Sequence, residues 1–268
     1  MIYITGDIHH MSMHTSDQKY MDCTEVEAAI TMAKIASLFN IKLSFFITGK
    51  AVAEETEKVN KLNSFNNVEL GGHNYYAFKP IWLYKVLFSK ILGNVNGPDI
   101  WQNFEIRKTI NTIHSKIGVK ITTWRDHAYK CNNSTNQLLA NNNISVVSNV
   151  IDPSFLSPEK DFKTNMNILG VNIWPDHDHI IHGDQACKSG KVACLQRSKF
   201  PARYFTIHQW SSKVKKDIEE LLSNNNSPVL LIHPGCMNVA DNFKSFTEIC
   251  EFIHDMNKIT MFASEVRL

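Results

Sequence analysis

The chain has 268 residues, of which 43% are hydrophobic, and its formal net charge is +2. That length and hydrophobic content suit a substantial core, and we expect one domain over residues 1–268. So mild and evenly spread a charge gives no reason to expect nucleic acid or a membrane surface as a partner. No stretch approaches the roughly 18 consecutive apolar residues of a membrane span. The opening residues lack a signal-peptide pattern, which predicts a cytoplasmic protein.

Strand-like and helix-like segments alternate along the chain. The first is a strand over residues 2–5, and the second is a helix over 24–39, where Thr24 and Glu27 form the signature of a capping box. Further apolar, β-branched runs predict strands at 43–48, 68–71, 119–124, 144–150, 171–174, 229–233 and 259–263. The helical period returns at 103–116, 134–140, 213–222 and 243–256.

This alternation predicts an α/β fold with a parallel sheet covered by helices, either an open sheet or a closed barrel. No glycine-rich dinucleotide or phosphate loop follows a predicted strand, so the Rossmann and P-loop interpretations lose their main support. Residues 152–203 are rich in Pro, Lys, Asp and His and have weak periodicity. We expect a long excursion over one rim there, of the kind that carries substrate contacts.

Polar side chains follow several predicted strands, at the end where parallel folds bind ligands. Asp7 and His9 follow the first strand, and side chains two positions apart in an extended segment point to the same side. His73 follows the third strand, residues 124–127 (Trp-Arg-Asp-His) end the fourth, and His233 ends the penultimate one. Chance is a poor explanation for histidines placed so regularly.

This set of side chains suits metal-assisted hydrolysis. Histidine and carboxylate ligands would hold a divalent ion that polarises a carbonyl group and lowers the pKa of a bound water. His9 and His73 are the candidate ligands. Asp7 would take the proton from the water, Arg125 would hold Asp7 ionised and oriented, and His233 would protonate the leaving group.

The order of these motifs resembles the polysaccharide deacetylase superfamily, the NodB-homology or carbohydrate esterase family 4 group. The segments that carry the resemblance span nearly the whole chain and lie at 5–9, 45–49, 68–74, 124–139, 229–234 and 260–265. The resemblance implies a distorted (β/α)7 barrel and a hydrolase that removes an acetyl group from an N-acetylated amino sugar. It also implies a divalent metal, with zinc expected, and a role in surface polysaccharide biosynthesis on a nucleotide- or lipid-linked sugar.

Two positions depart from the family's pattern. His9 stands where the family has a metal-binding Asp, and Ala77 stands at the second histidine of its His-x-x-x-His motif. A site of His9 and His73 with Asp7 or His10 as the third ligand is one outcome, because zinc accepts such sets. A weak or absent metal is the other.

The resemblance also suggests residues that line a sugar cleft: Trp124, Tyr129, Trp174, His182 and Asp184. Trp174 would stack on a ring, and His182 or Asp184 would bind hydroxyl groups. The spacing from Arg125 to Tyr129 exceeds the common motif by one residue, which puts an oxyanion role for Tyr129 in question. The histidines and aspartates of 174–184 also fit a second metal site or a solvated loop.

Two other functions stay open. Metal-independent hydrolysis of another non-peptide C–N bond, such as that of a cyclic ureide, would explain Ala77 and would survive chelation. A non-catalytic glycan-binding barrel would show no turnover. The presence of both Asp7 and His233 argues against the second, because a binding module needs neither a base nor an acid there.

Overall fold

The computed structural model describes residues 1–13, 18–173 and 207–268. At its centre lies β1 (Ile2–Ile8), all of whose residues are buried, as expected for a strand covered on both faces. It pairs in parallel with β2 (Leu43–Ile47), β8 (Val229–Leu231) and β9 (Thr260–Met261). The sheet continues from β2 through β3 (Val68–Gly72), β4 (Thr123–Trp124), β5 (Val146–Val147), β7 (Met166–Ile168) and β6 (Glu159–Asp161). Among the described strands, only the β6–β7 pair is antiparallel.

The segment that follows β7 brings the two ends of the sheet together. The backbone N–H groups of Asn172 and Ile173 donate to the carbonyl of Val229 in β8, at 3.2 and 3.3 Å. The Asn172 side chain accepts from the Val229 N–H at 2.8 Å and donates to the Ser227 carbonyl at 3.0 Å. These bonds link the far end of the β5–β7 layer to the central strands, as a barrel requires.

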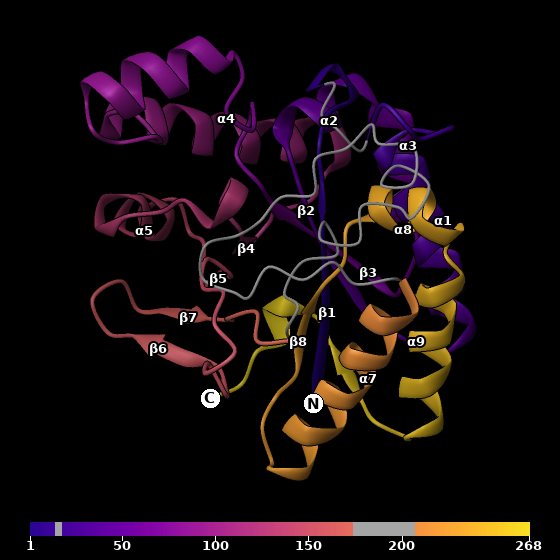
Figure 1. Ribbon diagram of the computed structural model, residues 1–268. Coiled ribbons are helices and arrows are strands. Elements are labelled where there is room, and N and C mark those ends of the chain that lie inside the picture. The colour runs from indigo at the N-terminus through magenta and orange to yellow at the C-terminus, as the bar shows by residue number, and fades with distance from the viewer. Residues whose placement is uncertain (14–17, 174–206) are drawn as a thin grey trace.

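Helices cover the outside of the sheet (Figure 1). On one side of β1 lie α1 (Glu25–Leu38), α7 (Ile207–Ser223), α8 (Pro234–Asp241) and α9 (Lys244–Asp255), and on the other α4 (Asp99–Ile117) and α5 (Asn133–Asn141). The capping box predicted at the start of α1 is present, since Thr24 accepts from the Glu27 N–H and Glu27 accepts from the Thr24 N–H. In the described part of the chain, the remaining helical elements are α2 (Gly49–Glu54), α3 (Thr56–Asn63), the π-helix η2 (Trp82–Ile91) and the short 3-10 turns η1 (Met11–Met13), η3 (His127–Tyr129) and η5 (Ala263–Glu265).

The prediction of one long excursion over 152–203 is wrong for its first part. Strands β6 and β7 form a hairpin within it, and β7 extends the sheet by pairing with β5. The sequence concealed the hairpin because β6 reads Glu-Lys-Asp and lacks an apolar run. The predicted strand at 171–174 is reduced, up to residue 173, to a bridge between Val171 and Ile151. The rest of the excursion lies outside the described residues.

Candidate active site

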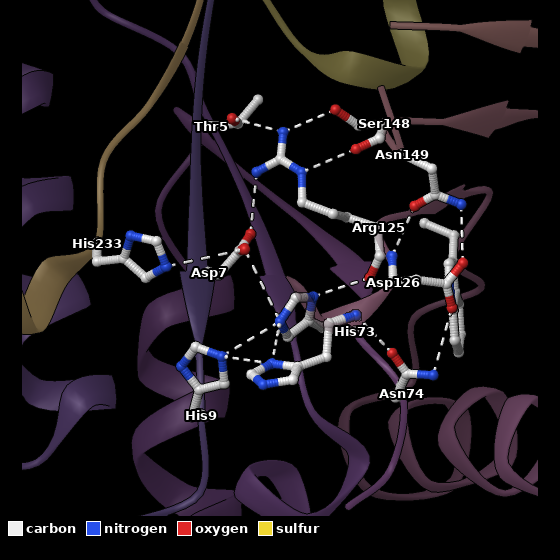
Figure 2. A network of polar contacts seen from close by, with 12 residues as sticks. Thr5, Asp7, His9, His73, Asn74, Arg125, Asp126, Ser148, Asn149 and His233 are labelled. Atoms are coloured by element: carbon white, nitrogen blue, oxygen red, sulfur yellow. Dashed lines mark hydrogen bonds and ion pairs between the residues drawn. The ribbon is translucent and has the colours of Figure 1, made fainter. Parts of the chain in front are cut away.

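Five residues singled out from the sequence meet at the carboxyl ends of the parallel strands (Figure 2). Asp7 is the penultimate residue of β1 and His9 follows that strand, while His73, Arg125 and His233 come just after β3, β4 and β8. All five side chains are buried. Close packing of β3 on β4 contributes, because a Cβ on Gly72 would collide with the ring of Trp124.

Arg125 binds one oxygen of the Asp7 carboxylate. Its Nη1 donates to Asp7 Oδ1 at 3.0 Å, and Nη2 donates to Thr5 Oγ1 at 2.9 Å and to Ser148 Oγ at 2.7 Å. The guanidinium is fully buried, and its Cζ lies 4.5 Å from the centre of the Phe46 ring. So many partners hold the guanidinium in one orientation, and with it the carboxylate.

The second oxygen of Asp7 faces the imidazoles. Asp7 Oδ2 lies 3.7 Å from His73 Nε2 and 3.9 Å from His233 Nε2 (Figure 2). The ring of His233 is stacked parallel to that of His9, with the ring centres 6.0 Å apart. One carboxylate oxygen therefore stands between two histidines that come from opposite sides of the pocket.

Three histidine nitrogens converge beside this oxygen. His9 Nε2 lies 3.2 Å from His73 Nε2 and 3.1 Å from His127 Nδ1, and the last two atoms are 3.3 Å apart. His127, which the sequence interpretation did not assign, is therefore the third candidate ligand. The alternative prediction of His10 as the third ligand is wrong, because His10 Nε2 lies 3.0 Å from the Tyr76 carbonyl oxygen.

The chemistry of these donors fits a divalent metal. Nδ1–H of His73 donates to the Arg125 carbonyl at 2.8 Å, and Nδ1 of His9 lies 3.2 Å from Glu25 Oε2, so both leave the Nε2 lone pair to face the centre. Burial, and next the repulsion that a protonated His9 would exert, lower the pKa of His73 and of His127 well below 6.5, which favours neutral rings. Tetrahedral ligands about 2.0–2.1 Å from zinc lie about 3.3 Å from one another, close to the separations seen here.

No protein-family model and no curated protein sequence match this chain. Its structure, however, is similar to solved ones. A protein from Mycobacterium smegmatis described as a polysaccharide deacetylase has 14% identity and a TM-score of 0.70 over 98% of this chain and 90% of that one. PuuE allantoinase has 9% identity and a TM-score of 0.64, over 95% and 84% of the two chains. A carbohydrate esterase family 4 pseudoenzyme from Bacillus anthracis has 12% identity and a TM-score of 0.58, over 99% and 64%.

The protein has the polysaccharide deacetylase fold. This likeness confirms the distorted (β/α)7 barrel expected from the motifs. Within this fold, the candidate metal site among the described residues consists of three histidines, His9, His73 and His127.

The third histidine of this candidate site depends on a turn that is hard to foresee. His127 opens η3, where Ala128 and Tyr129 have left-handed φ values of 54° and 57°. The His127 N–H donates to Asn74 Oδ1 at 2.7 Å, and Asn74 comes from the loop after β3. The available signal was position alone, since His127 comes shortly after β4, and β4 pairs with β3, the strand that His73 follows.

Asp126 ties this turn to the sheet. Its carboxylate accepts from Trp124 Nε1 at 3.0 Å, Asn149 Nδ2 at 2.7 Å and Asn74 Nδ2 at 3.3 Å, and none of these donors is charged. Burial raises the pKa of the Asp126 carboxyl from its usual 3.8 to about 7, although the hydrogen bonds work in the opposite direction.

The stability of the protein should depend on pH through Asp126. Because its folded pKa lies above its unfolded pKa, its contribution is fully present below about pH 4 and is lost as the pH rises through about 7. The free energy of unfolding of the wild type minus that of Asp126→Asn should therefore fall over this range. Urea unfolding at a series of pH values measures the difference. A difference independent of pH would mean that the three donors hold the carboxyl ionised.

Glu25 is the carboxylate behind His9, and its removal should weaken metal binding. Glu25→Gln should lower the affinity about 10- to 100-fold, the usual effect of removing a carboxylate that orients a metal-binding histidine. Competition with a chromophoric chelator measures this affinity. Glu27→Gln is the matched control, because Glu27 lies in the same first turn of α1 and bonds to Thr24 and Lys58 instead. Equal affinities in the two variants would contradict the role of Glu25.

The residues predicted to line a sugar cleft differ in where the structure places them. Trp124 is contradicted: its side chain is fully buried in the main core, with its N–H bonded to Asp126, so it has no surface to offer a sugar. Tyr129 is half-buried, with its ring centre 5.7 Å from Arg125 Cζ. Trp174, His182 and Asp184 lie outside the described residues. One contact that the sequence did not suggest is Phe78, whose ring centre lies 5.0 Å from that of His127.

Proposed function

We propose that the protein is a metal-dependent hydrolase that removes an acetyl group from an N-acetylated amino sugar. The observation that carries the proposal is the position of Asp7 Oδ2 beside both the histidine triad and His233. A base, an acid and a set of metal ligands then face one small volume, which suits attack of water on an amide. The sugar substrate and a role in surface polysaccharide biosynthesis rest on the family resemblance of the motifs.

Each residue has a distinct part in this mechanism. His9, His73 and His127 would hold the ion, which when bound polarises the amide carbonyl and lowers the pKa of a water. Asp7 takes the proton of the attacking water at Oδ2, while the Arg125 bond to Oδ1 keeps the carboxylate aimed at the site. His233 donates a proton to the leaving amine nitrogen, which could not otherwise depart as a neutral group.

Acetate release tests the proposal. The purified protein is incubated with a panel of N-acetylated amino sugars and with allantoin, before chelation, after exhaustive chelation and after zinc is restored. We expect equal amounts of acetate and free amine from at least one sugar, loss of turnover on chelation, and recovery with the metal.

A variant of His233, the proposed general acid, strengthens this test. His233→Ala should lower turnover about 10²- to 10⁴-fold with the metal content unchanged. His114→Ala, on the exposed side of α4, is the matched control and should behave as the wild type. Activity that survives chelation would instead favour metal-independent C–N hydrolysis. A metal-loaded protein without turnover on any sugar would favour a glycan-binding barrel.

A further inference from the structure

A large apolar surface stands at the edge of the protein, beyond α4. We call it the rim patch and define it by the exposed side chains of Ile81, Trp82, Val86, Leu87, Ile91, Leu92, Ile100 and Phe104. It belongs to η2, the purple helix beyond α4 in Figure 1, and to the first turns of α4. Trp82, Ile91 and Ile100 are 64%, 67% and 86% exposed. More than half of the large apolar side chains exposed among the described residues lie here, and such a concentration marks an interaction site.

The helix η2 is apolar on both faces. Its inner face holds Tyr84 and Phe88, which pack against Trp101 with ring centres 6.3 and 5.8 Å away, and Trp101 Nε1 donates to the Tyr84 hydroxyl at 3.1 Å. On its outer face Trp82 and Val86 are about one turn apart, as are Leu87 and Ile91. An ordinary surface helix presents polar side chains there. The inner face anchors the helix, so the outer face is free to meet something else.

The charged side chains around the rim patch indicate which kind of partner it binds. Lys85 and Lys90 are exposed on η2, Lys79 is half-buried just before it, and the sequence has no Asp or Glu from Leu70 to Pro98. Beside the patch, Arg107 and Lys108 line a hollow of about 600 Å³ together with Ile100 and Phe104. The acidic side chains of α4 are Asp99, at its first residue, and Glu105, which is buried.

Exposed apolar side chains ringed by lysines match an anionic bilayer surface, where apolar groups enter the headgroup layer and cations meet lipid phosphates. The exposed Trp82 agrees with this, because tryptophan concentrates at membrane interfaces. Protein interfaces, by contrast, are depleted in lysine. At ten residues, η2 is also far too short to cross the roughly 30 Å hydrocarbon layer.

We propose that the rim patch docks the protein on an anionic lipid bilayer, with η2 lying in the headgroup layer. A row of aromatic rings connects this surface to the candidate site, since Phe78 lies 5.4 Å from Tyr84 of η2 and 5.0 Å from His127, centre to centre. Docking therefore places the site next to the bilayer. Resting on the proposed function, this favours a lipid-linked amino sugar as the substrate.

Vesicle sedimentation tests docking without any need for turnover. The full chain is mixed with vesicles of phosphatidylcholine alone or of phosphatidylcholine with phosphatidylglycerol. We expect binding to the anionic vesicles that weakens with added salt. Trp82→Glu with Ile91→Glu should reduce the partition coefficient at least about tenfold. Replacing Lys85 and Lys90 with Gln should reduce it about fivefold per residue, and replacing them with Glu should reduce it further.

Matched controls keep the test specific. Phe162→Glu and Lys163→Glu change exposed residues at the turn between β6 and β7, and should bind as the wild type does. Trp82→Phe should keep binding but lose the blue shift of tryptophan fluorescence that vesicles cause. Failure of the wild type to bind anionic vesicles would overturn the proposal, as would equal binding by the patch variants. A wild-type dimer that the patch variants convert to a monomer would assign the patch to a second copy instead.

Discussion

Replacing Asp7 with Asn is expected to lower acetate release about 10²- to 10⁴-fold while leaving the metal content unchanged. The amide has nearly the same shape, and its oxygen can still accept from Arg125 Nη1, but it cannot take a proton from water. The buried guanidinium also loses its only described ionic partner. The free energy of unfolding should therefore fall by up to about 3–5 kcal/mol. Turnover, elemental analysis and urea unfolding measure the three quantities.

The matched control for this variant is Asp255→Asn, which changes an exposed carboxyl at the end of α9. It should leave turnover and stability at wild-type values. If Asp7→Asn kept the wild-type rate with a full metal content, another group would have to be the base, and the proposed mechanism would be wrong.

Replacing His127 with Ala is expected to reduce metal affinity by more than about 100-fold, because even a residue behind a ligand contributes 10- to 100-fold. His127 supplies one of the three converging nitrogens, and the remaining pair, His9 and His73, cannot enclose an ion alone. Turnover should fall in parallel. Competition with a chromophoric chelator and elemental analysis provide the measurement.

His10→Asn is the informative companion to this variant, because the sequence alone offered His10 as a third ligand. In the structure the His10 ring bonds to the Tyr76 carbonyl and to Ser12, away from the triad. We therefore expect this variant to keep its metal. A wild-type affinity in His127→Ala, combined with a loss in His10→Asn, would show that the third ligand had been misassigned.

Most of the fold follows from local patterns in the sequence. The capping box at Thr24 and the apolar runs at β1, β2 and β8 were each visible because their interactions lie within one element. The hairpin of β6 and β7 was not visible, because its residues are polar and are held by pairing with β5 rather than by burial of an apolar run. A strand that forms because it pairs with a neighbouring strand need not show a strand pattern in its own residues.

Some residues of the candidate site could likewise be predicted from local sequence patterns, and one could not. The candidate base, brace and acid could be predicted from the sequence, because Asp7, Arg125 and His233 each lie at or just after the end of a recognisable strand, and strand ends of a parallel sheet meet. The third candidate ligand, His127, could be recognised only once the chain was folded. Its ring reaches His9 through a left-handed turn pinned by Asn74, a residue of another loop.

The net charge of the chain likewise did not predict the local charge around the rim patch. Averaged over the chain, the charge gives no hint of a membrane surface, since it amounts to +2. Folding places Lys85 and Lys90 beside the exposed apolar face of η2, away from acidic side chains of its own segment. Electrostatic attraction to a surface acts over about 10 Å and therefore depends on which charges are neighbours in space, which composition does not contain.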